Sequence, residues 1–413
     1  MIAHSLKGCV KVNYSDVKMD FINLPGKEKK MLRKIIGFLL FWGGIFVLLV
    51  SPSQVVAQSS TSKLPQMISL TAYGVGSSGY VQASAIADAL MKKLGAQIRV
   101  MPAGNDVSRL QPLKRGQVQF ALTGVGGYYF AVEGMEDFAS LDWGPQHIQT
   151  IWNVFPVGGS SLGTAKDAGI KTPYDLKGKR IFWLPGSPAF NITNTAILAF
   201  ANLTWDDVVK VDYPSYSAAL RGIVEGTCDG GFTTGTAATL YELESSRRGI
   251  WWPEFPASDV EGWKRLQAVA PYMIPMRNYG APGIPPEGLD TMTYSYPMLL
   301  VYNSLDENLV YEVTKAIDEG FSLYKDAYPA MANWERSKAI VPSLTVPFHA
   351  GAVKYFREIG LWNKDFEAAQ KRNLLRQDKL ATAWNMAVSE AKAKGIKKEE
   401  FPAFWLKKRT EIK

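Results

Sequence analysis

Two segments of the chain repeat one order of elements: a strand, a loop rich in glycine and serine, and an amphipathic helix. The first has a predicted strand at 67–73, the loop 74–80 and a helix that ends before Gly95. The second has a strand at 180–184, the loop 185–191 and another helix. This alternation predicts an α/β fold, whose ligands bind beyond the carboxyl ends of the strands, where both loops fall. Further strands are predicted at 97–101, 117–123, 147–155 and 210–213.

The first loop, Gly74-Val75-Gly76-Ser77-Ser78-Gly79, has the GxGxxG spacing of a dinucleotide site. Such a site also needs an acidic residue at the end of the second strand, but Val100 is followed by Met101-Pro102-Ala103. The weaker inference is that free backbone amides and the hydroxyls of Ser77 and Ser78 form an anion-binding site. A glycine turn that binds nothing is the alternative.

Length and charge narrow the classes of protein that fit. The chain has 413 residues, 47% of them hydrophobic, and one core usually stops growing at about 250 to 300 residues, so we expect two lobes. The net charge of +8 lies at the ends, because residues 58–362 hold 25 Lys and Arg against 28 Asp and Glu. A body with net charge −3 lacks the basic cluster that binds nucleic acid, and no nucleic-acid partner is expected.

Cysteine and histidine are too scarce for most catalytic or metal sites. Cys9, Cys228, His4, His147 and His349 are the whole supply. We expect no disulfide framework, no metal, no cofactor and no enzyme activity. Cys228 is expected to be a small buried side chain, and His147 and His349 to be structural.

The N-terminal region has the features of an export signal. Arg33 and Lys34 precede sixteen uncharged, mostly apolar residues at 35–50, and Val55-Val56-Ala57 follows. This order predicts a signal peptide cut after Ala57, with the true start at Met1 or Met31. No cysteine directly follows the apolar stretch, so a soluble periplasmic protein without a lipid anchor is expected. A permanent membrane anchor is the alternative.

Several spaced motifs then occur in one order and resemble the TAXI-type solute-binding receptors of TRAP transporters over residues 67–362. They are the run from Thr71 to Gly124, Asp175-Leu176-Lys177-Gly178-Lys179-Arg180, Pro185-Gly186-Ser187, Tyr213 to Gly235, Pro271 to Tyr279, Leu299 to Gly320, and His349 to Phe356.

The resemblance implies a type II periplasmic-binding-protein fold, with two lobes joined by crossing strands and a ligand cleft between them. It divides the chain into 64–157 and 299–362 for the first lobe and 158–298 for the second. It implies capture of a small carboxylate, either an acidic amino acid or a di- or tricarboxylate, and delivery to an ion-coupled TRAP permease. A periplasmic sensor or adaptor that presents the same ligand to a membrane signalling protein stays open.

The residues that match the family's ligand-binding loops belong to both lobes. They are Gly76, Ser77, Ser78, Gly79, Tyr80 and Thr123 in the first lobe, and Gly186, Ser187, Asn191, Tyr216, Thr233 and Thr234 in the second.

The chain departs from the family pattern at Asn105-Asp106-Val107-Ser108-Arg109, which Pro112 follows. Because proline disrupts a helix interior, we expect the next helix to start near Gln111 and to leave Arg109 in the loop. There Arg109 could bind a ligand carboxylate through two hydrogen bonds, unless it is an ordinary surface arginine. Pro188 replaces the family's glycine and removes a donor. We therefore expect a larger or more acidic ligand.

Two regions lie outside that site. The aromatic run from Trp251 to Pro256, with Trp263, is expected to pack in the core. Residues 363–413 hold 13 Lys and Arg against 7 Asp and Glu and predict a basic helical extension, with a long helix at 365–394. Packing of this helix against one lobe is the simpler expectation, and contact with lipid or the transporter is the alternative.

Overall fold

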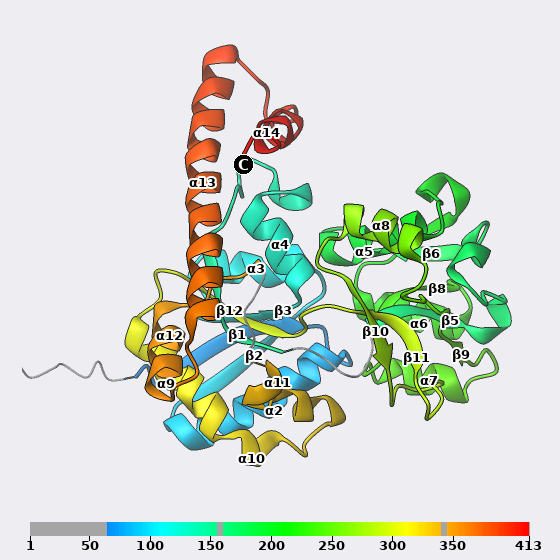
Figure 1. Cartoon of the computed structure of the whole chain (residues 1–413), viewed down its shortest axis with the longest axis horizontal. Helices are drawn as coiled ribbons and strands as arrows, with labels where there is room; N and C mark the ends of the chain where they lie inside the picture. The colour runs from blue at the N-terminus through cyan, green and yellow to red at the C-terminus, as the bar shows by residue number, and fades with distance from the viewer. Residues whose placement is uncertain (1–63, 155–159, 340–344, 413) are drawn as a thin grey trace, which may run out of the picture. The chain divides into compact units, whose positions relative to one another are not determined.

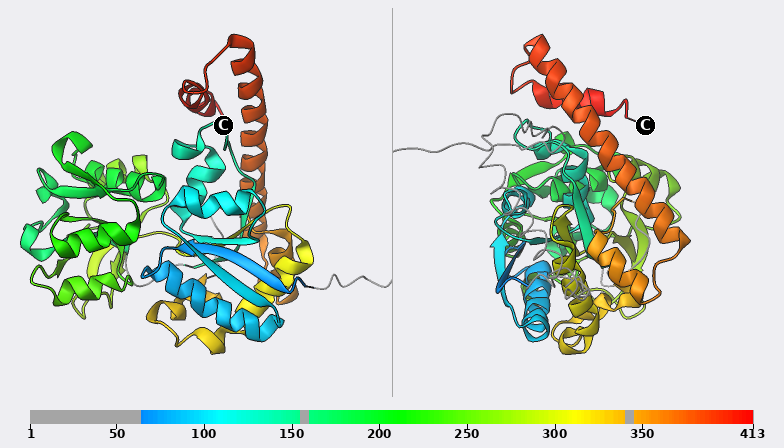
Figure 2. Two further views of the ribbon diagram at one scale, coloured as in Figure 1. Left: turned by 180° about the vertical axis from the view of Figure 1, so that it is seen from behind. Right: turned by 90° about the vertical axis from the view of Figure 1, so that its left-hand side faces the viewer.

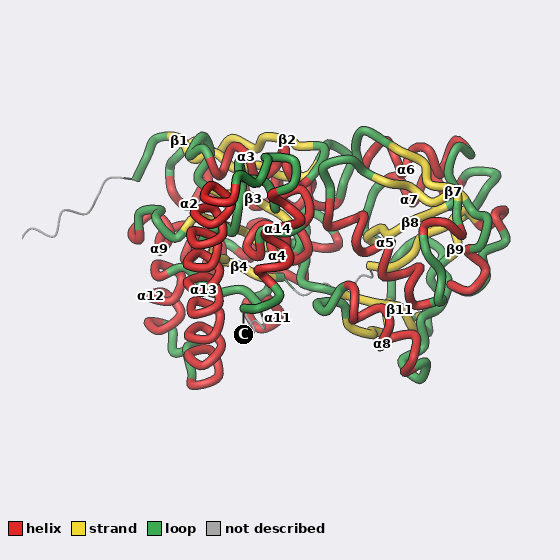
Figure 3. The backbone as a smooth tube through the Cα atoms, turned by 90° about the horizontal axis from the view of Figure 1, so that it is seen from above, coloured by secondary structure: helices red, strands yellow, loops and turns green. Residues whose placement is uncertain are grey.

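The computed structural model describes residues 64–154, 160–339 and 345–412. The predicted export segment, 1–57, lies outside these ranges. Lobe 1 is built on a five-stranded sheet in the order β2-β1-β3-β12-β4, and lobe 2 on a five-stranded sheet in the order β7-β6-β8-β5-β9. Figure 3 shows the strands lying among helices.

The two sheets have matching topologies. In lobe 1, β1 (Met67–Tyr73) is parallel to β2 (Gln97–Ala103) and β3 (Phe120–Thr123), and β12 (Met298–Tyr302) lies antiparallel between β3 and β4 (Ile148–Asn153). In lobe 2, β6 (Arg180–Trp183) is parallel to β7 (Val209–Asp212) and β8 (Gly230–Thr234), and β5 (Ser160–Ala165) lies antiparallel between β8 and β9 (Ile250–Trp251).

The antiparallel strand of each lobe follows directly after a crossing of the chain. The chain leaves lobe 1 after β4 and enters lobe 2 with β5; it returns after the hairpin β10 (Ile274–Asn278) and β11 (Leu289–Thr293) and enters lobe 1 with β12. Each sheet thus receives one strand from a crossing segment. This reciprocal arrangement is the type II periplasmic-binding-protein fold, so the predicted fold class is confirmed.

Helices cover both sheets (Figure 1). Those of lobe 1 are α2 (Ser78–Leu94), α3 (Asp106–Lys114), α4 (Val125–Glu133), α9 (Glu307–Glu319), α10 (Phe321–Tyr324), α11 (Arg336–Ala339) and α12 (Ala350–Glu358), with short 3-10 turns at Glu136–Phe138 and Pro329–Trp334. Those of lobe 2 are α5 (Pro188–Phe200), α6 (Tyr216–Glu225), α7 (Thr239–Ser245) and α8 (Val260–Val269), with 3-10 turns at Lys166–Ala168, Pro173–Leu176 and Trp205–Asp207.

The C-terminal extension forms α13 (Lys364–Lys394) and α14 (Phe401–Arg409), which lie side by side in Figures 1 and 2. Trp405 is fully buried, and its indole N–H donates to the carbonyl of Gly134 at 2.7 Å. The Glu133 carboxylate at the end of α4 accepts from Arg376 at 2.7 Å and from Arg409. The expectation that this extension packs back on a lobe is confirmed.

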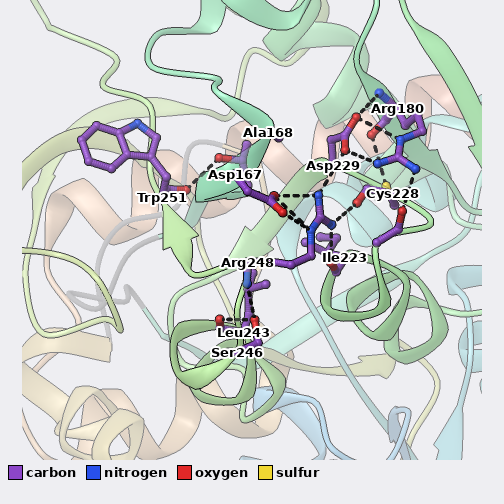
Figure 4. Close-up of polar contacts among 12 residues, drawn as sticks. Asp167, Ala168, Arg180, Ile223, Cys228, Asp229, Leu243, Ser246, Arg248 and Trp251 are labelled. Carbon is purple, nitrogen blue, oxygen red and sulfur yellow. Dashed lines mark hydrogen bonds and ion pairs between the residues drawn. The ribbon is translucent and has the colours of Figure 1, made fainter.

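A network of charged side chains lies where β6 and β8 begin, at the opposite end of the lobe 2 sheet from the glycine-serine loop (Figure 4). Arg180 opens β6 and donates to Asp229, the residue before β8, and Arg248 also pairs with Asp229 at 3.4 Å. Cys228 lies beside them, fully buried, and burial raises the pKa of its thiol to about 11. The expectation that Cys228 is a small buried side chain is confirmed.

Candidate ligand-binding site

The first glycine-serine loop starts α2 with a side-chain cap. The Ser77 hydroxyl accepts the backbone N–H of Tyr80 at 3.2 Å and donates to the carbonyl of Gly74 at 2.7 Å. Gly76 has φ +86° and is exposed, so glycine suits this turn. The hydroxyl of Ser77 is therefore used by the helix start itself.

Ser78 faces lobe 2. Its hydroxyl accepts from the hydroxyl of Thr236 in lobe 2 at 2.6 Å and from the amide of Gln82 at 2.9 Å. Ser217 of lobe 2 donates to the carbonyl of Val75 in the same loop at 3.0 Å. The loop that the sequence singled out thus lies at the junction of the two lobes.

Gly79 and Tyr80 occupy the first turn of α2. A Cβ atom on Gly79 would lie 2.3 Å from Cδ2 of Tyr73, so only glycine allows the helix to approach the end of β1 this closely. Tyr80 is half-buried. Neither residue lines the cavity between the lobes described below.

The predicted start of α3 near Gln111 is wrong. The helix begins at Asp106, because Asn105 accepts the backbone N–H of Ser108 at 2.8 Å and Ser108 accepts that of Asn105 at 3.2 Å, which is a capping box. Pro112 lies inside α3, where it removes one backbone hydrogen bond without ending the helix.

Arg109 therefore lies within α3 and not in a loop. Its side chain is 1% exposed. Nη1 donates to Oδ1 of Asp106 at 2.7 Å and to Oγ1 of Thr123 at 3.2 Å. The guanidinium carbon lies 3.6 Å from the centre of the Tyr73 ring, a cation–π contact. Nε of Arg109 has no hydrogen-bond partner among the described residues.

The Asp106 carboxylate connects the two lobes. While Oδ1 accepts from Arg109, Oδ2 accepts from the backbone N–H of Ala189 at 2.9 Å and from the hydroxyl of Ser187 at 3.2 Å. Ser187 and Ala189 stand at the start of α5 in lobe 2, where backbone N–H groups and the helix dipole favour an anion. A carboxylate from lobe 1 thus occupies the anion-binding site at the start of α5 in lobe 2.

Neighbouring backbone contacts support this junction. The N–H of Val107 donates to the carbonyl of Gly186 at 3.1 Å, and the side-chain amide of Asn105 donates to the carbonyl of Pro185 at 3.3 Å. Gly186 has φ +73°, and a Cβ there would lie 3.0 Å from Nδ2 of Asn105. The second glycine-serine loop, like the first, meets the opposite lobe.

The remaining predicted residues of lobe 2 are buried and bond within that lobe. The hydroxyl of Tyr216 bonds to that of Thr233 and accepts the backbone N–H of Thr234 at 3.3 Å, and its ring stacks on Phe190 with ring centres 4.5 Å apart. Asn191 binds both the N–H and the carbonyl of Leu184, each at 2.8 Å, so its amide holds the loop in place.

Between the lobes remains a cavity of about 10 Å³, room for about one water molecule. Its lining is mostly aromatic: Tyr73, Gly124, Gly126, Ala189, Phe190, Thr193, Phe232, Tyr272 and Tyr294. The structure thus shows the lobes closed, with protein side chains filling the space between them.

Burial keeps the tyrosines of this lining, and the neighbouring Tyr216, neutral. Burial raises the pKa of Tyr216 to about 12 and raises the pKa of Tyr73, Tyr272 and Tyr294 above the usual value of 10.0. The buried hydroxyl of Tyr272 has no partner at hydrogen-bond geometry among the described residues. Ser160, Ser161 and Thr234, at the same end of the lobe 2 sheet, also have buried hydroxyls without a partner in the described ranges.

An open groove of about 700 Å³ runs along α3 at the edge of this junction. It reaches from Asn105 and Arg115, which flank the two ends of α3, to Pro185 and Gly186 in lobe 2. Val107 and Gly186, whose backbone groups form a hydrogen bond next to Asp106, also line the groove.

The structure brings Arg109 and Ser187 to one carboxylate, with Thr123 bonded to Arg109 and Gly186 bonded to the neighbouring Val107. It also brings Thr233 and Thr234 to the hydroxyl of Tyr216. Ser77 and Asn191 serve the local loops, and Gly76 and Tyr80 lie outside the cavity. Sequence reasoning missed Asp106 as a site residue, although it named the departure from the family pattern there. It also missed Thr236 and the aromatic residues of the lining, of which Tyr73 had a signal because it ends a strand.

Within the described part of the chain, no group of three or more His, Cys, Asp or Glu could hold a metal ion. His349 is buried and caps α12 by accepting the N–H of Gly351 at 3.1 Å, so its predicted structural role is confirmed. None of the helices in the described ranges has the length and apolar character that crossing a bilayer requires.

Residues 70–360, about seven tenths of the chain, match the sequence pattern of the NMT1-like family. The chain belongs to this family.

Three solved structures are similar to it in fold. MatC from Rhodopseudomonas palustris with bound malate has a TM-score of 0.46 at 13% identity, over 75% of this chain and 99% of that one. PhnD1 from Prochlorococcus marinus, in complex with methylphosphonate, has 0.42 at 10%, over 72% and 100%. An ancestral arginine-binding protein bound to arginine has 0.39 at 15%, over 66% and 99%.

Proposed function

We propose that this protein is the periplasmic solute-binding component of a membrane transporter and captures a small carboxylate by closing its lobes around it. The observation that carries the proposal is the binding of a carboxylate between the lobes, by Arg109 of lobe 1 and by Ser187 and the Ala189 N–H of lobe 2. In the structure this carboxylate belongs to Asp106. The same donors suit the acid group of a ligand.

The fold provides the motion that such a receptor needs. Two lobes joined by crossing strands can open and close about those strands, and a ligand that contacts both lobes stabilises the closed state. Donors on both lobes converge on one carboxylate, so binding of an acid is coupled to closure. The closed form would be the one that the transporter recognises.

The transporter in the proposal is an ion-coupled TRAP permease, because the motifs of the chain resemble TAXI-type receptors. The signal-peptide pattern before Gln58 supports export to the periplasm. The ligands in the proposal are acidic amino acids and di- or tricarboxylates. No step of chemical conversion is part of it, since the groups around the site are suited to binding.

The test is isothermal titration of the purified protein, freed of ligand by unfolding and refolding, with glutamate, succinate and citrate. We expect Ser187→Ala to weaken binding of the active acid by roughly 2- to 13-fold, the effect of losing about 0.5 to 1.5 kcal/mol of hydrogen bonding. Ser389→Ala, an exposed change on α13, is the matched control and should leave the affinity unchanged. Equal affinities for all three proteins would remove the start of α5 from the site.

A further inference from the structure

The position of Asp106 has a consequence for which ligands the protein can hold. The carboxylate of Asp106 is fully buried, and three donors from two lobes bind its two oxygens at 2.7 to 3.2 Å. These distances and partners are those of a bound ligand acid. The chain itself thus places an acid group where the proposed function expects the acid group of the ligand to bind.

We propose that Asp106 is a tethered carboxylate that occupies the ligand's acid subsite and competes with the ligand for it. This inference rests on the proposed function and adds the means by which the cleft selects its ligand. Asp106 and Arg109 are both on α3, whereas Ser187 and Ala189 are on α5. When the lobes separate, the pair stays together on lobe 1 and the two donors of lobe 2 become free.

Competition with a tethered group sets a threshold for the ligand. A group held on the chain acts at a high effective concentration, so an acid that only reproduces its hydrogen bonds does not displace it. A successful ligand needs further contacts. The buried hydroxyls of Tyr272 and Thr234 and Nε of Arg109 lack partners in the described ranges, and they could bind additional oxygen atoms. The ligand class is thus an acid with several polar groups, not a simple monocarboxylate.

The same contact holds the lobes closed without a ligand. The side-chain oxygens of Asp106 accept hydrogen bonds from both lobes, and the backbone bond from Val107 to Gly186 lies next to them. Since α3 and α5 meet through this carboxylate, its removal should favour the open state. An acid that binds to the wild type must therefore first displace Asp106 from Ser187 and Ala189.

The experiment compares ligand-free wild type with Asp106→Asn, which keeps the shape of the side chain and removes its charge. Small-angle X-ray scattering should give the wild type a radius of gyration that matches the closed structure and the variant a larger one. In titrations with glutamate, succinate and citrate, the variant should bind the active acid about tenfold more tightly, as expected if roughly one wild-type molecule in ten is open. Asp88→Asn, an exposed change on α2, is the control and should behave as the wild type.

Asp106→Asn leaves Arg109 without its buried charged partner and could misfold for that reason. A second variant therefore tests the same contact without removing that charge. Ser187→Ala removes one donor of lobe 2 and keeps the charged pair, and its ligand-free radius of gyration should also increase. The inference is overturned if both folded variants stay as compact as the wild type. Scattering without ligand is independent of the proposed function: open variants that bind none of the acids would support the tether and contradict the ligand class.

Discussion

Ser77 and Ser187 stand at the starts of two helices that the sequence presents as equivalent, but their hydroxyls have different partners. Ser77 caps α2 and bonds only within its own loop, whereas Ser187 donates across the lobes to Asp106. The difference arises because α2 has a side-chain cap and α5 has none. An uncapped helix start keeps its donors available, so we place the acid subsite at α5.

A second prediction for a single residue concerns His349 and the pH dependence of stability. Burial lowers the pKa of this imidazole below 6.5, so it is neutral in the folded protein near pH 7. As the pH falls below about 6.5, the unfolded chain binds a proton at this position before the folded chain does, and the free energy of unfolding should decrease. His349→Asn retains an N-cap acceptor for Gly351 and does not titrate.

Urea denaturation of both proteins between pH 5 and pH 8 tests this effect. The difference in free energy of unfolding between wild type and His349→Asn should be constant above about pH 7 and should change by at most ~1.4 kcal/mol per pH unit below about pH 6.5. The change should be a loss of wild-type stability. Parallel curves over the whole range would mean that His349 does not cause the loss of stability at low pH.

At the scale of elements, α14 is an integral part of lobe 1. Trp405 is fully buried against Trp384, with ring centres 4.9 Å apart. Trp405→Ala should lower the free energy of unfolding by about 3 to 5 kcal/mol, because it removes a large core side chain. Met386→Ala on α13 is the control, since Met386 is 68% exposed, and should change stability by less than about 0.5 kcal/mol. Urea denaturation that finds equal stabilities would show that the extension is not packed on the lobe.

Elements with strong local signals could be predicted from the sequence. The strand predicted at 67–73 is β1 (Met67–Tyr73), and the helix predicted at 365–394 is α13 (Lys364–Lys394). The start of α3 could not be predicted from Pro112 alone, because the capping box of Asn105 and Ser108 outweighs one lost hydrogen bond. Trp251 was expected in the core but is 40% exposed, since it lies on the edge strand β9.

At the scale of the whole molecule, the order of the strands determines what the site contains. Both glycine-serine loops lie at the junction of the lobes because each follows the first parallel strand of its sheet. That much could be inferred from alternation and loop composition. The contact between Asp106 and Ala189 joins residues far apart in sequence and depends on how α3 and α5 meet, so no local pattern predicts it. The same holds for the aromatic lining, which five separate segments supply.

The most direct test of the central claim is native mass spectrometry of the protein isolated from the periplasm of its own host. We predict a chain that begins at Gln58 and carries one noncovalently bound small molecule, which on release proves to be an acid with several polar groups. Citrate, succinate or glutamate added to ligand-free protein should restore such a complex. A bound molecule without an acid group would contradict the account, as would a protein that takes up none of these acids.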